Sequence, residues 1–113
     1  EMSASLGAGD VYKRQIHNTD YIKVRDVNFG QKGASQFIAS ASSRYHGGKI
    51  ELRIDSLEGE IIGTLNIPYT GEWENWEEHS TNIKTTKGIH DLYLVFRGRT
   101  PHELFNLDYW MFK

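Results

Sequence analysis

The chain has 113 residues, of which 13 are basic, 15 are acidic and none is cysteine. This length suits one domain with a single hydrophobic core, and the balanced charge excludes the basic excess expected of a protein that binds nucleic acid or an acidic membrane. The absence of cysteine excludes a disulfide framework and a thiolate metal site, and no apolar run approaches the length of a membrane span.

Residues 1–15 differ from the rest of the chain. Residues 10–15, with the sequence DVYKRQ, resemble the translated end of a transposon-type sequencing adapter, and the alternative is an ordinary flexible leader. Residues 3–9 are small and weakly apolar, unlike a signal peptide. We therefore expect residues 1–15 to be a non-native or disordered leader and residues 16–113 to form the folded module.

The following segments show the two-residue period of half-buried strands. This alternation runs through residues 21–29 and, with small residues that favour tight packing, through residues 37–41. Residues 49–55 alternate cleanly, and after a turn residues 61–67 are expected to pair back as a hairpin. Pro68 ends this strand, because proline lacks the amide donor of a ladder.

The second half of the chain continues the strand pattern. Residues 76–83 are expected to form a polar strand, and residues 89–97 are apolar on both faces, which predicts a central position in a sheet. Residues 103–112 form the last expected strand, and no segment has helical periodicity. Seven short strands separated by glycine-containing turns predict an all-β fold with two antiparallel sheets packed as a β-sandwich.

The loop after the predicted hairpin holds two tryptophans. Trp73 lies between Glu72 and Glu74, a poor setting for a core side chain. An exposed ring in a loop is a platform on which the C–H face of a sugar can stack, and the alternative for Trp73 is a structural loop anchor. Trp76 begins the next strand and is expected in the core.

Two polar residues stand at the start of the last strand. Asn106 offers both a donor and an acceptor, which suits adjacent sugar hydroxyls, whereas the alternative is a turn-capping asparagine. Asp108 stands among apolar residues, where an unpaired charge is costly. Arg53 and Arg97 are candidate partners for the Asp108 carboxylate.

Catalytic motifs are missing from the sequence. The five histidines have no ligand spacing such as HExxH, and there is no GxSxG elbow. The neighbouring acids Glu58 and Glu60, or Glu72 and Glu74, lie on one turn, whereas a glycosidase pair flanks the scissile bond from two sides of a cleft. The sequence therefore predicts a protein that is not an enzyme.

Four blocks of the sequence occur in the order found in family 6 carbohydrate-binding modules: DYIKVRDVNFG (20–30), GGKIELRIDSLEGEIIGTLNIPYTGEWENW (47–76), GIHDLYLVFRG (88–98) and LFNLDYWMF (104–112). The chain thus resembles this family over residues 16–113. The resemblance implies a jelly-roll β-sandwich that binds carbohydrate without catalysis.

The resemblance also implies roles for single residues. Trp73 matches the stacking tryptophan of the family and Asn106 its sugar-binding asparagine, with Glu72 a weaker candidate beside them. Asp108 matches a ligand of a structural calcium, although the family's acidic first strand is missing if the leader is non-native. Gln15 stands where the family has a second aromatic, so a sugar would be stacked on one face only.

A second surface is implied for some family members on the concave face of a sheet. Tyr21 matches an aromatic of that surface, and Asp55 lies at the position of an acidic residue near it. The alternatives are a residue that packs on the sheet face for Tyr21 and a turn aspartate at a strand end for Asp55.

We expect a monomeric, secreted or cell-surface module that binds a polysaccharide or oligosaccharide. It would target a covalently linked glycoside hydrolase to a plant or algal polymer such as xylan or β-glucan, with neither nucleic acid nor a membrane as partner. The alternative function is a structural or adhesion β-sandwich without a working sugar site. An exposed Trp73 ring beside Asn106 would favour the first function.

Overall fold

A computed structural model describes residues 2–5, 14–16, 18–44, 47–98 and 104–113, the first two ranges as backbone only. The described part of the chain contains nine strands: β1 (Met2–Ser5), β2 (Arg14–Ile16), β3 (Tyr21–Asn28), β4 (Ala34–Ser42), β5 (Gly48–Ile54), β6 (Ile61–Ile67), β7 (Glu77–Thr86), β8 (Ile89–Arg97) and β9 (Phe105–Phe112). No helix long and apolar enough to cross a membrane occurs among these residues.

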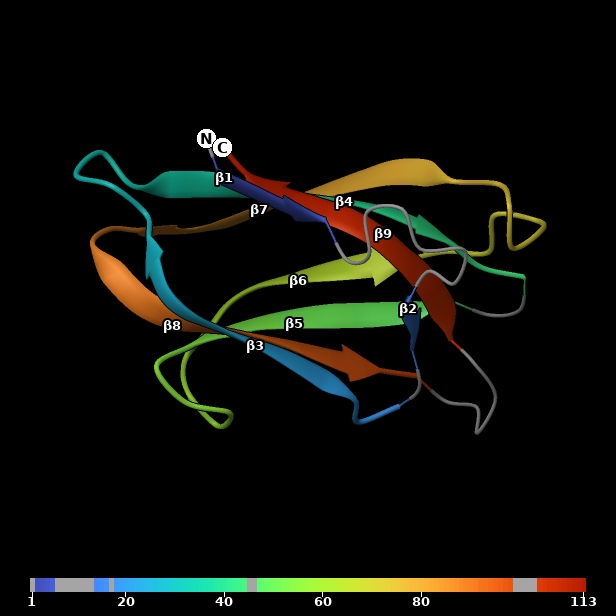
Figure 1. Ribbon diagram of the computed structural model, residues 1–113, viewed down its shortest axis with the longest axis horizontal. Helices are drawn as coiled ribbons and strands as arrows, with labels where there is room; N and C mark the ends of the chain where they lie inside the picture. Colours follow the sequence, from blue (N-terminus) through green and yellow to red (C-terminus); the bar gives the residue numbers. More distant parts are fainter. Residues whose placement is uncertain (1, 6–13, 17, 45–46, 99–103) are drawn as a thin grey trace.

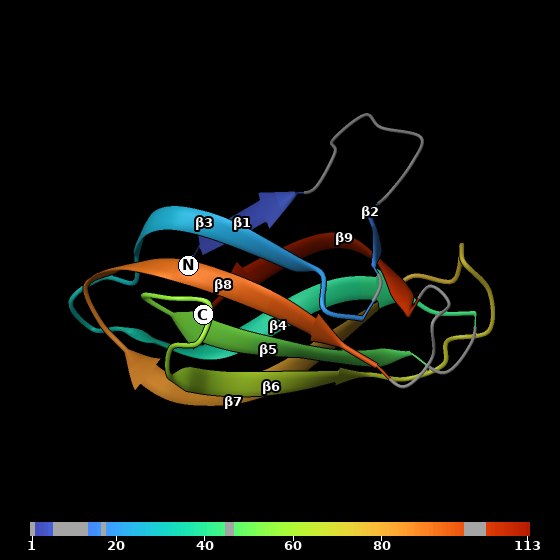
Figure 2. The ribbon, with the colours of Figure 1, turned by 90° about the horizontal axis from the view of Figure 1, so that it is seen from below.

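The strands form two antiparallel sheets that face each other (Figures 1 and 2). The first sheet has the order β1-β9-β4-β7, with β2 also paired to β9, and the second has the order β3-β8-β5-β6. The predicted all-β, two-sheet jelly-roll sandwich is therefore confirmed. The predicted central position of residues 89–97 is also confirmed, because β8 lies between β3 and β5.

The core lies between the two sheets. From β8 the side chains of Leu92, Leu94 and Phe96 point inward and are fully buried. From the opposite sheet come Phe37 and Phe112, whose ring centroids are 5.1 Å apart. Burying one large apolar side chain contributes roughly 1.5–3 kcal/mol, so the alternation seen in the sequence is what holds the two sheets together.

The connections gather at two ends of the sandwich. What we call the loop end, at the right of Figure 1, holds the β6–β7 loop (residues 68–76) and the starts of β5 and β9. What we call the turn end, at the left, holds the β3–β4, β5–β6 and β7–β8 turns. The strands from β3 to β9 thus run between the loop end and the turn end of the sandwich.

The N-terminal residues of the chain add backbone to the first sheet. β1 pairs with the end of β9, with Met2 opposite Phe112. β2 pairs with the start of β9, with Gln15 opposite Asn106. Whether residues 1–15 are native sequence is a separate question, so the boundary at residue 16 stays a prediction.

Candidate binding site at the loop end

Trp73 lies in the β6–β7 loop, as the sequence predicts, but its side chain is half-buried rather than fully exposed. Its backbone carbonyl accepts a hydrogen bond from the Ser42 hydroxyl at the end of β4. Gly71, two residues earlier, has a φ of +112°, a backbone conformation that favours glycine. The loop therefore bends back onto the sheet and holds Trp73 against it.

The base of this loop is tied to Ser43, the residue after β4. The amides of Thr70 and Gly71 donate to the Ser43 carbonyl at 2.9 and 3.2 Å, and the Ser43 amide donates to the Thr70 hydroxyl oxygen at 2.8 Å. The Asn75 side-chain amide donates to the Thr70 carbonyl and closes the loop on itself. A loop fixed in this way loses little conformational entropy when a ligand binds.

Asn106 is the second residue of β9 and is only 8% exposed. It lies opposite Ser42 in the β4–β9 ladder, so Ser42 is next to Asn106 and also binds Trp73. The Asn106 Oδ1 atom is buried and has no hydrogen-bond partner in the described part of the chain. An unsatisfied buried acceptor costs roughly 1–3 kcal/mol, which a donor from a ligand would relieve. The turn-capping alternative is wrong for this oxygen.

A further hydrogen bond of Ser43 connects the base of the loop to the residue before β9. The Ser43 hydroxyl donates to the Leu104 carbonyl at 2.8 Å, in a buried hydrogen bond. Consecutive residues at the end of β4, Ser42 and Ser43, therefore hold both Trp73 and the residue that precedes β9. The sequence pattern did not single out these serines, because their partners lie 31 and 61 residues away along the chain.

Glu72 lies on the solvent side of the loop. Its carboxylate is 3.9 Å from the Arg44 guanidinium, and both side chains are more than half exposed. Arg44 was also missed from sequence, since no short-range pattern links it to Glu72. The pair adds charge and hydrogen-bonding groups beside Trp73 without burying either.

The burial of Trp76 differs from the expectation. It was predicted to be in the core, but it is half-buried and does not belong to the buried apolar cluster. The reason is its position: it precedes β7, whose first residues lie at the sheet edge with Glu77 and Glu78 exposed.

The outer face of the second sheet does not bring Tyr21 and Asp55 together. Tyr21 pairs with Val95 toward the loop end, whereas the Asp55 amide donates to the Asp91 carbonyl at the turn end. Four residues of β8, or roughly 13 Å, separate these two positions. Tyr21 is 48% exposed.

Asp55 belongs to a structural cluster at the turn end. It has a φ of +73°, and its carboxylate accepts from His90 Nδ1 at 2.9 Å. His90 Nε2 lies 2.8 Å from the Lys87 carbonyl, so both ring nitrogens face acceptors. The hydrogen bond to Asp55 raises the pKa of His90 above its ordinary 6.5, although partial burial opposes the shift. This geometry agrees with the turn-aspartate alternative.

The centre of the same outer face is occupied by an Arg–Glu–Arg cluster. Glu51 accepts from Arg53 at 3.0 Å and from Arg97 at 3.3 Å. Burial alone would raise the pKa of Glu51, but the hydrogen bonds from the two arginines outweigh it and lower the pKa. Both arginines that were candidate partners of Asp108 thus bind Glu51.

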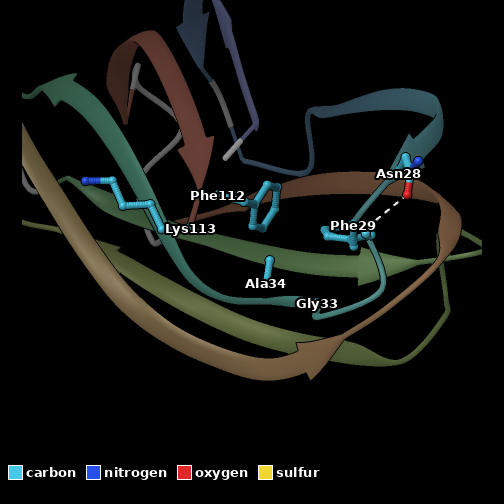
Figure 3. A pocket seen from close by; sticks show the side chains of 7 residues that line it. Asn28, Phe29, Gly33, Ala34, Phe112 and Lys113 are labelled. Carbon is cyan, nitrogen blue, oxygen red and sulfur yellow. Dashed lines mark hydrogen bonds between the residues drawn. The ribbon is translucent and has the colours of Figure 1, made fainter.

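A pocket of about 230 Å³ opens at the turn end (Figure 3). Phe29 and Phe112 form its apolar wall, with ring centroids 5.2 Å apart. The Asn28 side-chain oxygen already accepts from the Gly30 amide at 2.9 Å. The Asn28 oxygen in this pocket is therefore satisfied, unlike the Asn106 oxygen at the loop end.

Fold and loop end together define a class: a β-sandwich whose preorganised loop presents an aromatic ring and an unsatisfied amide, with no catalytic motif. Residues 4–113 match the family described as "Carbohydrate binding module (family 6)". The chain belongs to this family and is a non-catalytic carbohydrate-binding module.

Known relatives agree with this assignment. The chain is 44% identical over 97 residues, 86% of its length, to the arabinoxylan arabinofuranohydrolase of Bacillus subtilis (strain 168), and spans 19% of that enzyme. It is 38% identical, with a TM-score of 0.81, to a family 6 module from Clostridium cellulolyticum in complex with xylose, covering 87% of this chain and 74% of that one. It is 33% identical, with a TM-score of 0.82, to a β-1,3-glucan binding module from Bacillus halodurans, covering 87% and 72%.

Asp108 was expected to bind calcium. It lies at a bulge in β9, where Tyr109 pairs with Ser40 and Leu107 with Ala41. A module of family 36 in complex with calcium and xylotriose shares the fold, at 16% identity and a TM-score of 0.70. Among the described residues, however, no group of three or more acidic, histidine or cysteine side chains could hold a metal ion. The described residues therefore do not fit a calcium site by themselves.

Proposed function

We propose that this module binds a β-linked plant polysaccharide at the loop end, with xylan as the first candidate. The observation that carries the proposal is the unsatisfied Asn106 Oδ1, opposite Ser42 in the β4–β9 ladder, whose hydroxyl binds the Trp73 carbonyl. Xylan is favoured over other polymers because the relatives include an arabinoxylan-acting enzyme and a module solved with xylose.

The chemistry of binding divides between two side chains. The apolar face of a sugar ring stacks on the half-buried ring of Trp73, while a ring hydroxyl bonds the Asn106 side chain, whose Oδ1 turns toward the ligand on binding. Glu72, exposed beside them, accepts from a further hydroxyl. One stacking ring and a few hydrogen bonds support millimolar to micromolar affinity, on the order of −4 to −8 kcal/mol.

The module's biological role follows from tethering. Its relatives include large enzymes of which it would form about a fifth, so we propose a covalently linked glycoside hydrolase in a secreted or cell-surface protein. Binding to the polymer then raises the effective concentration of substrate at the linked enzyme. The module itself is expected to act as a monomer.

The proposal is tested by affinity electrophoresis in gels that contain soluble arabinoxylan, β-1,3-glucan or mixed-linkage β-glucan. Retardation on arabinoxylan is expected for the unchanged chain, and its loss for Trp73→Ala and Asn106→Ala. Ile89→Ala is the control, because Ile89 is 64% exposed at the turn end. If the unchanged chain migrates freely in every gel, the structural or adhesion alternative replaces the sugar function.

The second surface stays a prediction with its own test. Tyr21 is exposed enough for stacking, whereas Asp55 is engaged with His90. If this face binds sugar, Trp73→Ala leaves residual retardation that Trp73→Ala combined with Tyr21→Ala removes. Equal mobility of the two variants would leave the loop end as the sole site.

The calcium role of Asp108 also stays a prediction. If calcium binds with Asp108 as a ligand, the midpoint of thermal unfolding rises when calcium is added to chelator-treated protein, since a ligand specific to the folded state stabilises it. Asp108→Asn should abolish that rise. A midpoint unchanged by calcium in the unchanged chain would refute the role.

A further inference from the structure

Large exposed apolar side chains divide between the two ends of the sandwich by type. Among the described residues, the aliphatic ones, Leu57, Ile61 and Ile89, lie at the turn end. The aromatic ones, Tyr21 and Tyr69, lie toward the loop end. Aromatic rings, unlike aliphatic side chains, offer a flat face for stacking, so the division follows the location of the candidate site.

Tyr69 is the more exposed of the two aromatic residues, at 63%. In the described part of the chain its side chain makes no hydrogen bond, ion pair or ring contact. A ring that is mostly exposed contributes less to the fold than the buried aromatic rings do. Its exposed face is therefore available to a ligand.

The backbone on both sides of Tyr69 is nonetheless fixed. Pro68 precedes it and restricts φ to about −65°. Thr70 follows it, with its amide 2.9 Å from the Ser43 carbonyl and its hydroxyl oxygen 2.8 Å from the Ser43 amide. An exposed ring on a fixed backbone is preorganised for a ligand, because little conformational entropy of the backbone is lost on binding.

Tyr69 also lies next to the proposed sugar site. Thr70 and Trp73 are anchored on Ser43 and Ser42, consecutive residues of one strand end, which are roughly 3.3 Å apart. Tyr69 immediately precedes the first anchor, and the Asn75 side chain closes the loop between them. The two aromatics thus flank one compact loop.

We propose that Tyr69 is a second stacking platform, which extends the Trp73–Asn106 site by a further sugar unit of the same polysaccharide. The inference rests on the proposed function. Trp73 and Asn106 hold the first sugar, and the Tyr69 ring stacks against a neighbouring unit of the bound chain. The module therefore selects linked sugar units of a polymer over single sugars.

The test is isothermal titration of the 113-residue chain and its variants with xylose, xylobiose and xylotetraose, and in parallel with cellobiose and cellotetraose. Tyr69→Ala should weaken xylobiose and xylotetraose binding about three- to tenfold, the range for one aromatic contact, and leave xylose binding unchanged. Tyr69→Phe should bind like the unchanged chain, since it retains the ring. Ile89→Ala controls for loss of an exposed apolar side chain far from the loop.

The outcomes separate this inference from the proposed function. If Tyr69→Ala binds every sugar like the unchanged chain while Trp73→Ala loses binding, the function stands and the Tyr69 subsite is refuted. A loss by Tyr69→Ala that is equal for xylose and xylotetraose also refutes the extension, because Tyr69 would then belong to the first subsite. If the unchanged chain binds none of the sugars, the proposed function fails and the inference with it.

Discussion

Individual side chains at the two ends of the sandwich differ in how their polar atoms are satisfied. At the turn end the side chains bind each other or the backbone, as Asp55 does with His90 and Asn28 with Gly30. At the loop end the backbone is tied down through Ser43, yet the side-chain oxygen of Asn106 is left without a partner. A rigid backbone that carries an unsatisfied side chain is prepared for a ligand, whereas mutual satisfaction serves the fold.

The largest expected effect compares two glycines with positive φ, one at each end. Gly47, at the loop end, has a φ of +71°, and an added Cβ would lie 1.9 Å from the Ile67 carbonyl oxygen. Gly88, at the turn end, has a φ of +80° and open space around that position. Gly88→Ala should cost about 1–2 kcal/mol from backbone strain alone, and Gly47→Ala about 3 kcal/mol or more, because overpacking adds to the strain.

Urea unfolding followed by tryptophan fluorescence measures both variants. Equal losses for Gly47→Ala and Gly88→Ala would contradict the close backbone approach at the loop end. The comparison is controlled internally, since the φ values are similar and the added group is the same.

The next effect separates stability from binding. Ser43→Ala removes the buried hydrogen bond to the Leu104 carbonyl, and Thr86→Val removes one from the Thr86 hydroxyl to the Lys84 carbonyl at 2.8 Å at the turn end. Each should cost about 1–2 kcal/mol of unfolding free energy. Only Ser43→Ala should also weaken arabinoxylan retardation, because the lost hydrogen bond fixes Leu104 at the loop end, two residues before Asn106.

Affinity electrophoresis alongside urea unfolding decides this point. A Thr86→Val variant that loses sugar binding as strongly as Ser43→Ala would show that general destabilisation, not loop positioning, controls the site.

The difference between local patterns and long-range contacts explains what could be predicted from the sequence. The alternation in residues 49–55 and 89–97 predicted the buried faces of β5 and β8, because strand periodicity is local. Trp73 and Asn106 were singled out by residue type and family resemblance. Their connection through Ser42 was not, since it joins segments far apart in the chain.

The burial of side chains near sheet edges also could not be predicted from the local sequence pattern. Trp76 was expected in the core because tryptophan is apolar and begins a strand, yet the start of an edge strand has no covering layer. The isolation of Tyr69 was likewise invisible in sequence, because a tyrosine after Pro68 has the same local pattern whether its ring is packed or exposed.

A smaller effect concerns pH at the turn end. The pKa of His90 is raised above 6.5 by Asp55, so the folded state binds the proton more tightly than the unfolded state does. The resulting stability is fully present below pH 6.5 and is lost as the pH rises through the raised pKa. We expect less than about 1 kcal/mol, because the pair is partly exposed to solvent.

Thermal unfolding across this pH range measures the effect. The midpoint should fall with rising pH in the unchanged chain and fall less in His90→Gln. Sugar affinity measured over the same range should stay constant, since His90 lies at the end opposite the binding loop. A parallel drop in affinity would break the proposed independence of the two ends.

The smallest effect compares two exposed ion pairs, Arg44–Glu72 at the loop end and Lys84–Glu60 at the turn end. Exposed pairs contribute only about 0–1 kcal/mol, so Glu72→Gln and Glu60→Gln should both leave unfolding nearly unchanged. Glutamine keeps an acceptor oxygen but not the charge. If Glu72 accepts from a sugar hydroxyl, Glu72→Gln should weaken xylotetraose binding about two- to threefold, because a charged acceptor bonds more strongly than a neutral one, while Glu60→Gln should have no effect. Identical affinities for the two variants, measured by titration, would remove Glu72 from the site and leave Trp73, Asn106 and Tyr69 as its proposed contacts.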